Sequence, residues 1–205
     1  MKKILAIGAH PDDIEYAAFG YLYKEKQSGS QVYIALLTDG GNSTSIVDGV
    51  RMKEEERLCN KYGFEFIEFG RYKDGSLPFN NDSVGFIQGV IERIKPDEVL
   101  THYINDTHQD HISTAKSTLA ASRYTNNILM YSSFSTLEFV PSIFCDITDY
   151  IDEKRSALEC FSSQTKKNIN RNIDFVEYAI KVNAYYGTKI NKNYAEGFIP
   201  YRFLI

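Results

Sequence analysis

The stretch KKILAIGAHPDDIE, residues 2–15, decides the fold class. Its residues 4–7 form a continuous apolar run that is too short for a helix and ends at Gly8. Such a run is typical of a strand buried on both faces of a sheet. From Ile14 to Lys26 apolar residues recur every three or four positions, which predicts a helix directly after the strand. A strand joined to a helix in this way is the first half of a parallel β-α-β unit.

The same alternation continues along the chain. We expect five strands, at residues 4–7, 32–37, 64–69, 98–102 and 128–131, and four helices, at residues 14–26, 49–62, 84–94 and 110–123. The pattern predicts an α/β fold, a Rossmann-like and mainly parallel sheet of strand order 3-2-1-4-5 covered by helices on both faces. The last third is less regular, with a strand near 143–147, helices near 150–161 and 173–186, and an aromatic tail. Without an internal repeat or linker, residues 1–205 are expected to form a single domain.

Composition excludes several classes of protein. The net charge of −4 argues against a general electrostatic affinity for nucleic acid or anionic lipid. No stretch approaches the roughly 20 apolar residues of a membrane-spanning helix, and the N-terminus lacks the long apolar run of a secretory signal. Three separated cysteines indicate neither a thiolate zinc site nor a disulfide framework. We expect a cytoplasmic protein with no nucleic-acid partner and no membrane insertion, whose tyrosine-rich C-terminal third could form a homo-oligomer interface.

Two clusters of His and Asp follow strands one and four. The first is GAHPDDIE at residues 8–15, and the second is NDTHQDH at residues 105–111. In the order 3-2-1-4-5 these strands are neighbours, and ligands of open parallel sheets bind beyond the carboxyl ends of the strands where the order reverses. The topology alone should therefore bring both clusters to one crevice.

Both clusters have spacings that suit a metal. His10 and Asp13 are three residues apart across a strand-to-helix turn, and His108 and His111 have the same spacing. Two imidazoles and a carboxylate suit Zn²⁺ with one open coordination position, and the same set suits Fe²⁺. Asp12 is then placed to take a proton from metal-bound water, whose pKa zinc lowers to about 7.

Simpler interpretations exist for each cluster alone. The acids after Pro11 could be first-turn residues favoured by the helix dipole, and residues 108–111 could be a polar loop and helix cap. We expect His102, at the end of strand four, to be a packed or hydrogen-bonded histidine rather than a ligand.

At these residues the sequence resembles the PIG-L/LmbE-like zinc deacetylases. HPDDIE at residues 10–15 resembles the HPDD-x-E motif of that family, and HQDH at residues 108–111 resembles its second motif. Weaker matches follow in the family's order: RMKE at residues 51–54, KRSAL with SSQ within residues 154–164, and YAEGF at residues 194–198. The resemblance implies a hydrolase that removes the N-acetyl group from an N-acetylglucosamine-type sugar conjugate.

The resemblance also implies roles for the motif residues. His10, Asp13 and His111 would bind zinc. Asp12 would be the general base that takes a proton from metal-bound water and so leaves hydroxide. His108 would assist the tetrahedral oxyanion or the leaving amine, and Asp110 would orient His108 or a neighbouring ligand.

Substrate contacts implied by the resemblance lie outside the two clusters. Arg51 would hold the sugar or its anionic substituent and Glu54 would hold Arg51, although a solvated, charge-rich helix face is the alternative for both. Tyr194 would face the substrate, with packing in the core as the alternative. Residues 38–45 form a polar loop that is either a sugar-contacting lid or a plain surface loop.

This chain departs from the family pattern at two places. Ala17-Ala18-Phe19-Gly20 stands where many members have a glycine-rich segment, which leaves the shape of the substrate open. The second motif lacks the proline often found between its His and Asp.

Three other functions compete with deacetylation. A nucleotide-binding Rossmann-like domain needs a glycine-rich first turn, whereas Asp12 and Asp13 would repel phosphates there. A non-catalytic metal-binding domain is compatible with the motifs. A metal-dependent phosphoesterase usually needs a second metal and more ligands than the sequence offers.

Overall fold

The computed structural model describes residues 1–41, 49–164 and 174–204. Its helices and strands follow one another in this order: β1 Lys3–Gly8, α1 Asp13–Gln27, β2 Gln31–Thr38, α2 Val50–Tyr62, β3 Glu65–Tyr72, α3 Asn81–Ile94, β4 Glu98–His102, α4 Gln109–Ala121, β5 Asn127–Tyr131, β6 Ile143–Asp146, the 3-10 helix η2 Thr148–Tyr150, α5 Ile151–Glu159, α7 Phe175–Lys189 and β7 Ala195–Arg202. Residues 42–45 of the lid-or-loop segment 38–45 lie outside the described residues.

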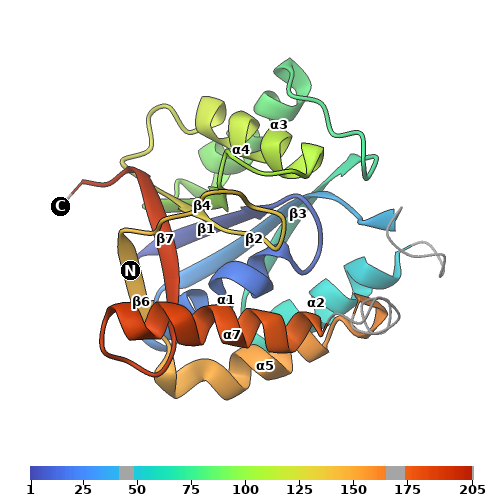
Figure 1. The fold of residues 1–205 in the computed structure, drawn as a ribbon. Helices are drawn as coiled ribbons and strands as arrows, with labels where there is room; N and C mark the ends of the chain where they lie inside the picture. Colours follow the sequence, from blue (N-terminus) through green and yellow to red (C-terminus); the bar gives the residue numbers. More distant parts are fainter. Residues whose placement is uncertain (42–48, 165–173, 205) are drawn as a thin grey trace.

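The seven described strands form one sheet of order β3-β2-β1-β4-β5-β7-β6 (Figure 1). β1 to β5 are parallel, so the expected order 3-2-1-4-5 is confirmed. β7 then pairs antiparallel with both β5 and β6, which makes the sheet mixed at this side.

β7 is the element that the sequence did not predict. Its residues were expected to form an irregular aromatic tail. Pro200 lies within the strand, although proline cannot donate to a ladder. The pairing with β6 ends at Phe198, so Pro200 lies where only one side of β7 has a partner strand. A proline is tolerated at such a position because its missing N–H interrupts no ladder there.

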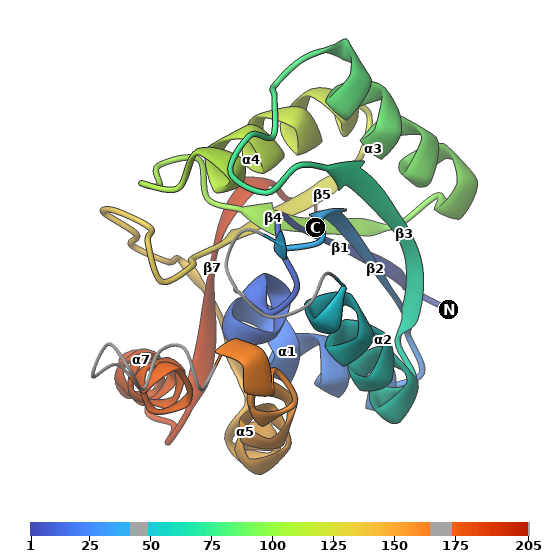
Figure 2. The ribbon, with the colours of Figure 1, turned by 90° about the vertical axis from the view of Figure 1, so that its right-hand side faces the viewer.

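Helices cover both faces of the sheet, as the sequence predicts. α1, α2, α5 and α7 lie on one face, and α3 and α4 lie on the other (Figures 1 and 2). The apolar run of β1 divides between the two layers: Ile4 and Ala6 join the core under α1, and Leu5 and Ile7 join the core under α3. Burial on both faces explains why this strand is continuously apolar.

Local signals fix where the helices begin. Asn80 caps α3 with a capping box to Ser83, so that helix starts three residues earlier than the apolar periodicity alone indicates. α1 begins at Asp13, immediately after Asp12, whose φ of 97° lies in the left-handed region. The unfavourable backbone conformation in the tight turn between β1 and α1 is therefore that of Asp12, a residue of the first His/Asp cluster.

A candidate metal and catalytic site

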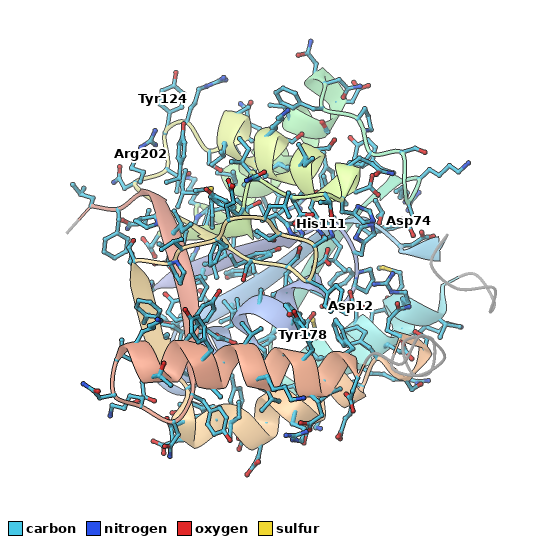
Figure 3. All side chains as sticks on the ribbon, viewed as in Figure 1. Asp12, Asp74, His111, Tyr124, Tyr178 and Arg202 are labelled. Carbon is cyan, nitrogen blue, oxygen red and sulfur yellow. The ribbon has the colours of Figure 1, made fainter. Side chains whose placement is uncertain are left out.

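The two His/Asp clusters meet at the carboxyl edge of the sheet. β1 pairs directly with β4, so the turn after β1 and the loop after β4 lie side by side. The His10 ring centre is 4.8 Å from that of His108 and 5.4 Å from that of His111. The expected convergence of residues 8–15 and 105–111 is thus present in the structure (Figure 3).

Asp13 lies between two imidazoles. Its Oδ2 is 3.3 Å from His10 Nδ1, and its Oδ1 is 3.4 Å from His111 Nε2. Burial opposes ionisation of Asp13, but His111, His102 and His10 together hold its pKa well below the usual range. The carboxylate therefore stays ionised between two ring nitrogens.

Further carboxylates hold the outer nitrogens of the same rings. His10 Nε2 is 3.2 Å from Asp110 Oδ2 and 3.1 Å from Asp74 Oδ1. Asp110 is fully buried and also accepts backbone N–H groups from Gly75 and Leu77. The Asp110 carboxylate thus contacts His10, whereas His108 is bonded by the Asp110 backbone N–H.

His111 has a corresponding partner in Asp106. His111 Nδ1 is 3.3 Å from Asp106 Oδ2, and Asp106 also accepts hydroxyl hydrogen bonds from Ser133, Ser135 and Thr136. Burial acts against ionisation, but these hydrogen bonds and His111 lower the pKa of Asp106 strongly. The loop after β5 thus fixes one ring of the site through a buried carboxylate.

Sequence reasoning assigned no role to Asp74 or Asp106. Asp106 lies within the second cluster, and its position in the loop after a central strand was the available signal. Asp74 follows β3, whose end reaches the same edge of the sheet, but no His or Asp motif marks it. Its contact with His10 depends on the path of the loop after β3, which spacing cannot reveal.

Asp12 is paired with Arg51. Arg51 Nη2 donates to Asp12 Oδ1 at 2.7 Å and also to the Pro11 carbonyl, while Nη1 donates to the Gly40 carbonyl at 3.4 Å. Burial raises the pKa of Asp12 to about 6, although Arg51 opposes the shift. Arg51 is only 5% exposed, so the alternative of a solvated helix face is wrong for this residue.

His108 caps α4. Its Nδ1 accepts the backbone N–H of Asp110 at 3.2 Å, which confirms the helix-cap interpretation as part of its role. A ring that accepts at Nδ1 carries its proton on Nε2 when it is neutral. Burial and the neighbouring His111 and His10 lower the pKa of His108. The ring is therefore a neutral N–H donor rather than an imidazolium.

His102 is buried and hydrogen-bonded, as expected. Its Nε2 is 3.2 Å from both the Ala9 amide nitrogen and Asp13 Oδ2, and its ring packs against Tyr131. Burial, together with His111, lowers the pKa of His102 to about 4. The ring is neutral at physiological pH.

Two residues expected at the substrate lie elsewhere. The Glu54 carboxylate accepts hydrogen bonds from Ser162 and Ser163, so its partners are these serines and not Arg51. Tyr194 precedes β7, and its backbone bonds to Ile147 and Thr148. Ile147 packs near Gly20, two turns of α1 beyond Asp13, so the structure does not bring Tyr194 to the cluster.

The donor set fits a divalent cation such as Zn²⁺. One oxygen of Asp13 is 3.3 Å from His10 Nδ1 and the other is 3.4 Å from His111 Nε2, and ligands of one zinc ion lie at similar separations. Five buried aspartates gather here: Asp12, Asp13, Asp74, Asp106 and Asp110. Among the described contacts, Arg51 forms an ion pair with one of them, Asp12. Such an excess of buried negative charge is stable when a cation neutralises it. Among the described residues, the donor groups whose atoms lie within 4.8 Å of one another are His10–His108–His111, Asp13–His102–His111 and His10–Asp74–Asp110. The expected ligands His10, Asp13 and His111 are divided between the first two groups.

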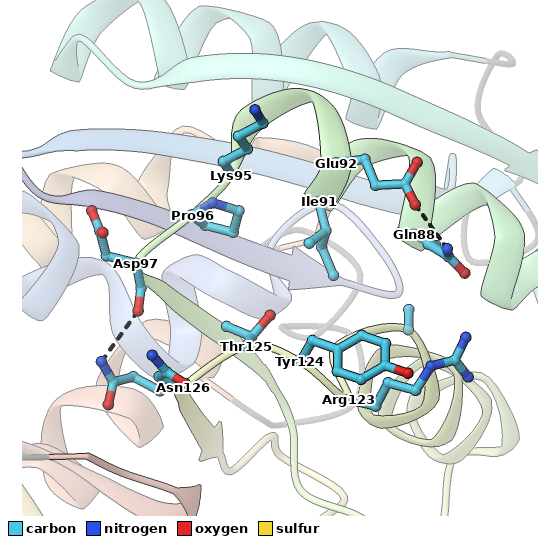
Figure 4. A pocket seen from close by; sticks show the side chains of 12 residues that line it. Gln88, Ile91, Glu92, Lys95, Pro96, Asp97, Arg123, Tyr124, Thr125 and Asn126 are labelled. Carbon is cyan, nitrogen blue, oxygen red and sulfur yellow. Dashed lines mark hydrogen bonds between the residues drawn. The ribbon is translucent and has the colours of Figure 1, made fainter.

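A separate cavity lies away from this cluster. It has a volume of about 560 Å³ and is lined by the end of α3 and the turn before β5, including Lys95, Arg123 and Tyr124 (Figure 4). Lys95 precedes β4 and Asn127 begins β5, so the cavity lies at the amino edge of the parallel strands. It contains none of the clustered histidines.

None of the helices within the described parts of the chain is long and apolar enough to span a bilayer.

Comparison with known proteins gives a consistent picture. The family model described as PIG-L, GlcNAc-PI de-N-acetylase, matches residues 5–122, more than half of the chain. The uncharacterized deacetylase YaiS of Escherichia coli K12 is 30% identical over 167 residues, covering 77% of this chain and 89% of YaiS. The diacetylchitobiose deacetylase of Thermococcus kodakarensis is 29% identical over 232 residues, covering all of this chain and 85% of that protein.

Structural similarity extends to a protein with another activity. GalB of Pseudomonas putida KT2440, a 4-carboxy-2-hydroxymuconate hydratase, superposes with a TM-score of 0.87 at 20% identity, over 100% of this chain and 98% of GalB. This likeness concerns the fold alone. The family model and the sequence relatives identify the chain as a member of the PIG-L family of deacetylases.

Proposed function

We propose that the chain is a metal-dependent N-deacetylase that releases acetate from an N-acetylglucosamine-type sugar conjugate. The observation that carries the proposal is the position of the Asp13 carboxylate, 3.3 Å from His10 Nδ1 and 3.4 Å from His111 Nε2. Relatives named as deacetylases support the reaction class, and the one named for diacetylchitobiose supports the substrate class.

His10, Asp13 and His111 would hold the metal, with Zn²⁺ or Fe²⁺ fitting the donor set. When bound, such a cation polarises the amide carbonyl and makes water more acidic. Asp110 and Asp74 would hold the outer nitrogen of His10, and Asp106 would hold that of His111. Outer carboxylates of this kind orient the rings that bind a metal.

Asp12 would act as the general base. Arg51 fixes its Oδ1, which leaves Oδ2 to accept the proton of the attacking water. A pKa of about 6 keeps the carboxylate ionised at neutral pH while making it a stronger base than an exposed aspartate. Arg51 would then position the base in addition to any contact with substrate.

His108 would donate from Nε2 to the developing oxyanion or to the leaving nitrogen. The bond from the Asp110 amide to Nδ1 fixes the ring in the tautomer that this role requires. A neutral imidazole donor stabilises negative charge as it forms, which is the main electrostatic requirement of amide hydrolysis.

Acetate release from N-acetylglucosamine conjugates, measured by mass spectrometry, tests the proposal. We expect turnover that a chelator abolishes and added Zn²⁺ or Fe²⁺ restores. Asp12→Asn should retain the metal but lose roughly 10²–10⁴-fold in kcat, the usual contribution of a general base. Asp82→Asn, on the first turn of α3, is the matched control and should leave turnover unchanged.

Two results would contradict the proposal. Chelator-resistant acetate release would exclude the metal. Full activity of Asp12→Asn would exclude Asp12 as the base.

A further inference from the structure

Two exposed aromatic side chains meet beside the His/Asp cluster. Phe134, in the loop after β5, and Tyr178, on α7, have ring centres 4.9 Å apart and an interplanar angle of 57°. Each side chain remains 48% exposed. The two rings therefore form an open corner whose outer faces are in contact with solvent.

The loop side of this corner is attached to the site itself. Phe134 lies between Ser133 and Ser135, whose hydroxyl oxygens are 3.1 and 3.3 Å from His111 Nδ1. The Ser135 carbonyl accepts the Thr107 N–H, so the loop is bonded to the segment that carries His108. The position of Phe134 relative to the clustered histidines is fixed by these bonds.

The helix side is also next to the site. Tyr16, one turn beyond Asp13 on α1, stacks on Phe175 and interacts electrostatically with Tyr178. In Figure 3 Tyr178 projects from α7 toward the sheet edge that carries Asp12 and His111. The aromatic corner therefore borders the cluster between the loop after β5 and α7.

An aromatic corner at the border of a polar site suits one kind of ligand. Sugar rings present an apolar face of C–H groups that packs on aromatic rings, and binding sites commonly combine such rings with a few polar groups. The cluster would take up the acetamide, so the corner is left for the part of the substrate beyond the first ring.

We propose that Phe134 and Tyr178 form a subsite for a second ring attached to the N-acetylated sugar. This inference rests on the proposed function. It adds that the preferred substrate is a two-ring conjugate, and that the preference arises in KM.

The experiment compares kcat/KM of the metal-loaded enzyme for methyl N-acetyl-β-glucosaminide and for N,N'-diacetylchitobiose. We expect a five- to tenfold preference for the two-ring substrate in the native chain. Phe134→Ala and Tyr178→Ala should remove it by raising KM for the two-ring substrate only. Tyr178→Phe keeps the ring and should keep the preference. Tyr185→Ala, an exposed tyrosine on the same helix, is the control and should change neither value.

Two outcomes would overturn the subsite. An unchanged preference in both alanine variants would show that the rings do not contact the substrate. With octyl N-acetyl-β-glucosaminide as a third substrate, a stronger preference for the octyl than for the two-ring glycoside would assign the corner to a flexible apolar chain.

A binding measurement separates this inference from the proposed function. Calorimetry with Zn²⁺-loaded Asp12→Asn protein should give five- to tenfold tighter binding of the two-ring sugar, lost on adding Phe134→Ala. If the native enzyme hydrolyses neither substrate but this difference is found, the deacetylase proposal fails and the subsite stands. Equal binding of both sugars would reject the subsite whatever the activity.

Discussion

Lys154 and Glu196 form a fully buried ion pair behind α1, whereas the His/Asp cluster at the carboxyl edge gathers more carboxylates than cations. Lys154 Nζ is 2.5 Å from Glu196 Oε1, and Glu196 also accepts the backbone N–H groups of Gly20 and Tyr21. Each charge of the pair is matched within the chain. The cluster instead has several carboxylates facing imidazole nitrogens, a set of donors that could hold a metal ion.

The difference separates structural motifs from functional ones. The KRSAL and YAEGF segments resemble the family as much as residues 51–54 do, yet their charged residues meet each other away from the site. A buried charge with a complete set of partners holds α1, α5 and β7 together. A buried cluster that gathers several carboxylates around imidazole rings is a candidate ligand site.

Breaking the matched pair should give the largest effect on stability. Lys154→Met leaves the Glu196 charge buried without its cation, and we expect a loss of about 3–5 kcal/mol in the free energy of unfolding, measured with urea. Lys154→Met combined with Glu196→Gln should recover more than half of it. Lys192→Met, which breaks the exposed pair with Asp146, should cost under about 1 kcal/mol. Equal losses at both lysines would show that burial of the pair is irrelevant.

Glu55 is a buried acid whose charge affects Asp12. Glu55 interacts electrostatically with Asp12, and burial raises its pKa to about 8. The folded chain then holds a proton that the unfolded chain, with a pKa near 4.3, has lost. Stability should therefore fall as the pH rises from about 4.5 through 8.

Glu55→Gln copies the protonated acid and should remove the part of this fall that Glu55 contributes, while Glu15, whose pKa burial also raises, keeps its own part. We expect the variant to match the native chain at pH 4 and to exceed it by a few kcal/mol at pH 8.5. Thermal unfolding across this range measures the difference. A parallel loss of stability in both proteins would mean that Glu55 does not keep its proton.

Asp106 tests the outer carboxylates of the cluster. Asp106→Asn keeps the shape but weakens the acceptor on His111 Nδ1, and we expect a 10–100-fold loss of metal affinity in competition with a chelator. Ser135→Ala removes one of several hydrogen bonds to Asp106 and should have a smaller effect. Unchanged affinity in Asp106→Asn would remove His111 from the proposed ligand set.

Arg51 gives the smallest expected effect and distinguishes two roles. If Arg51 positions the base, Arg51→Lys should lower kcat about tenfold and leave KM within twofold, because the contact with Asp12 changes but the substrate does not. If Arg51 binds the substrate, as the family resemblance implies, KM should rise instead. Steady-state kinetics on one N-acetylated sugar decide between the two.

The sequence predicted the parallel half of the fold because apolar strands and amphipathic helices alternate clearly from residue 4 to residue 131. It also predicted the meeting of residues 8–15 with 105–111, since strand order places β1 beside β4. β7 escaped prediction because it forms by antiparallel pairing with β5 and β6, which lie well before it in the chain. That information resides in the pairing, not in the run itself.

Side-chain partners were less predictable than positions. Arg51 stands in a helix rich in charge, and only the packing of α2 beside the turn at Gly40 reveals that it is buried. Glu54 and Tyr194 matched the family motif in sequence, but their contacts lie with Ser162, Ser163 and Thr148. The contact of Asp74 with His10 depends on the path of the loop after β3. These partners depend on tertiary contacts between elements distant in the chain.

The backbone of Asp12 has one further consequence. A non-glycine residue at φ 97° costs about 1–2 kcal/mol that glycine would not incur. Glycine at position 12 would remove this cost but would leave the buried Arg51 without its carboxylate partner. Random variants screened for heat resistance alone should therefore acquire glycine at position 12 only together with an uncharged residue at position 51, and variants screened for turnover should keep aspartate. The residue found there after each kind of screen would report which demand the native chain has satisfied.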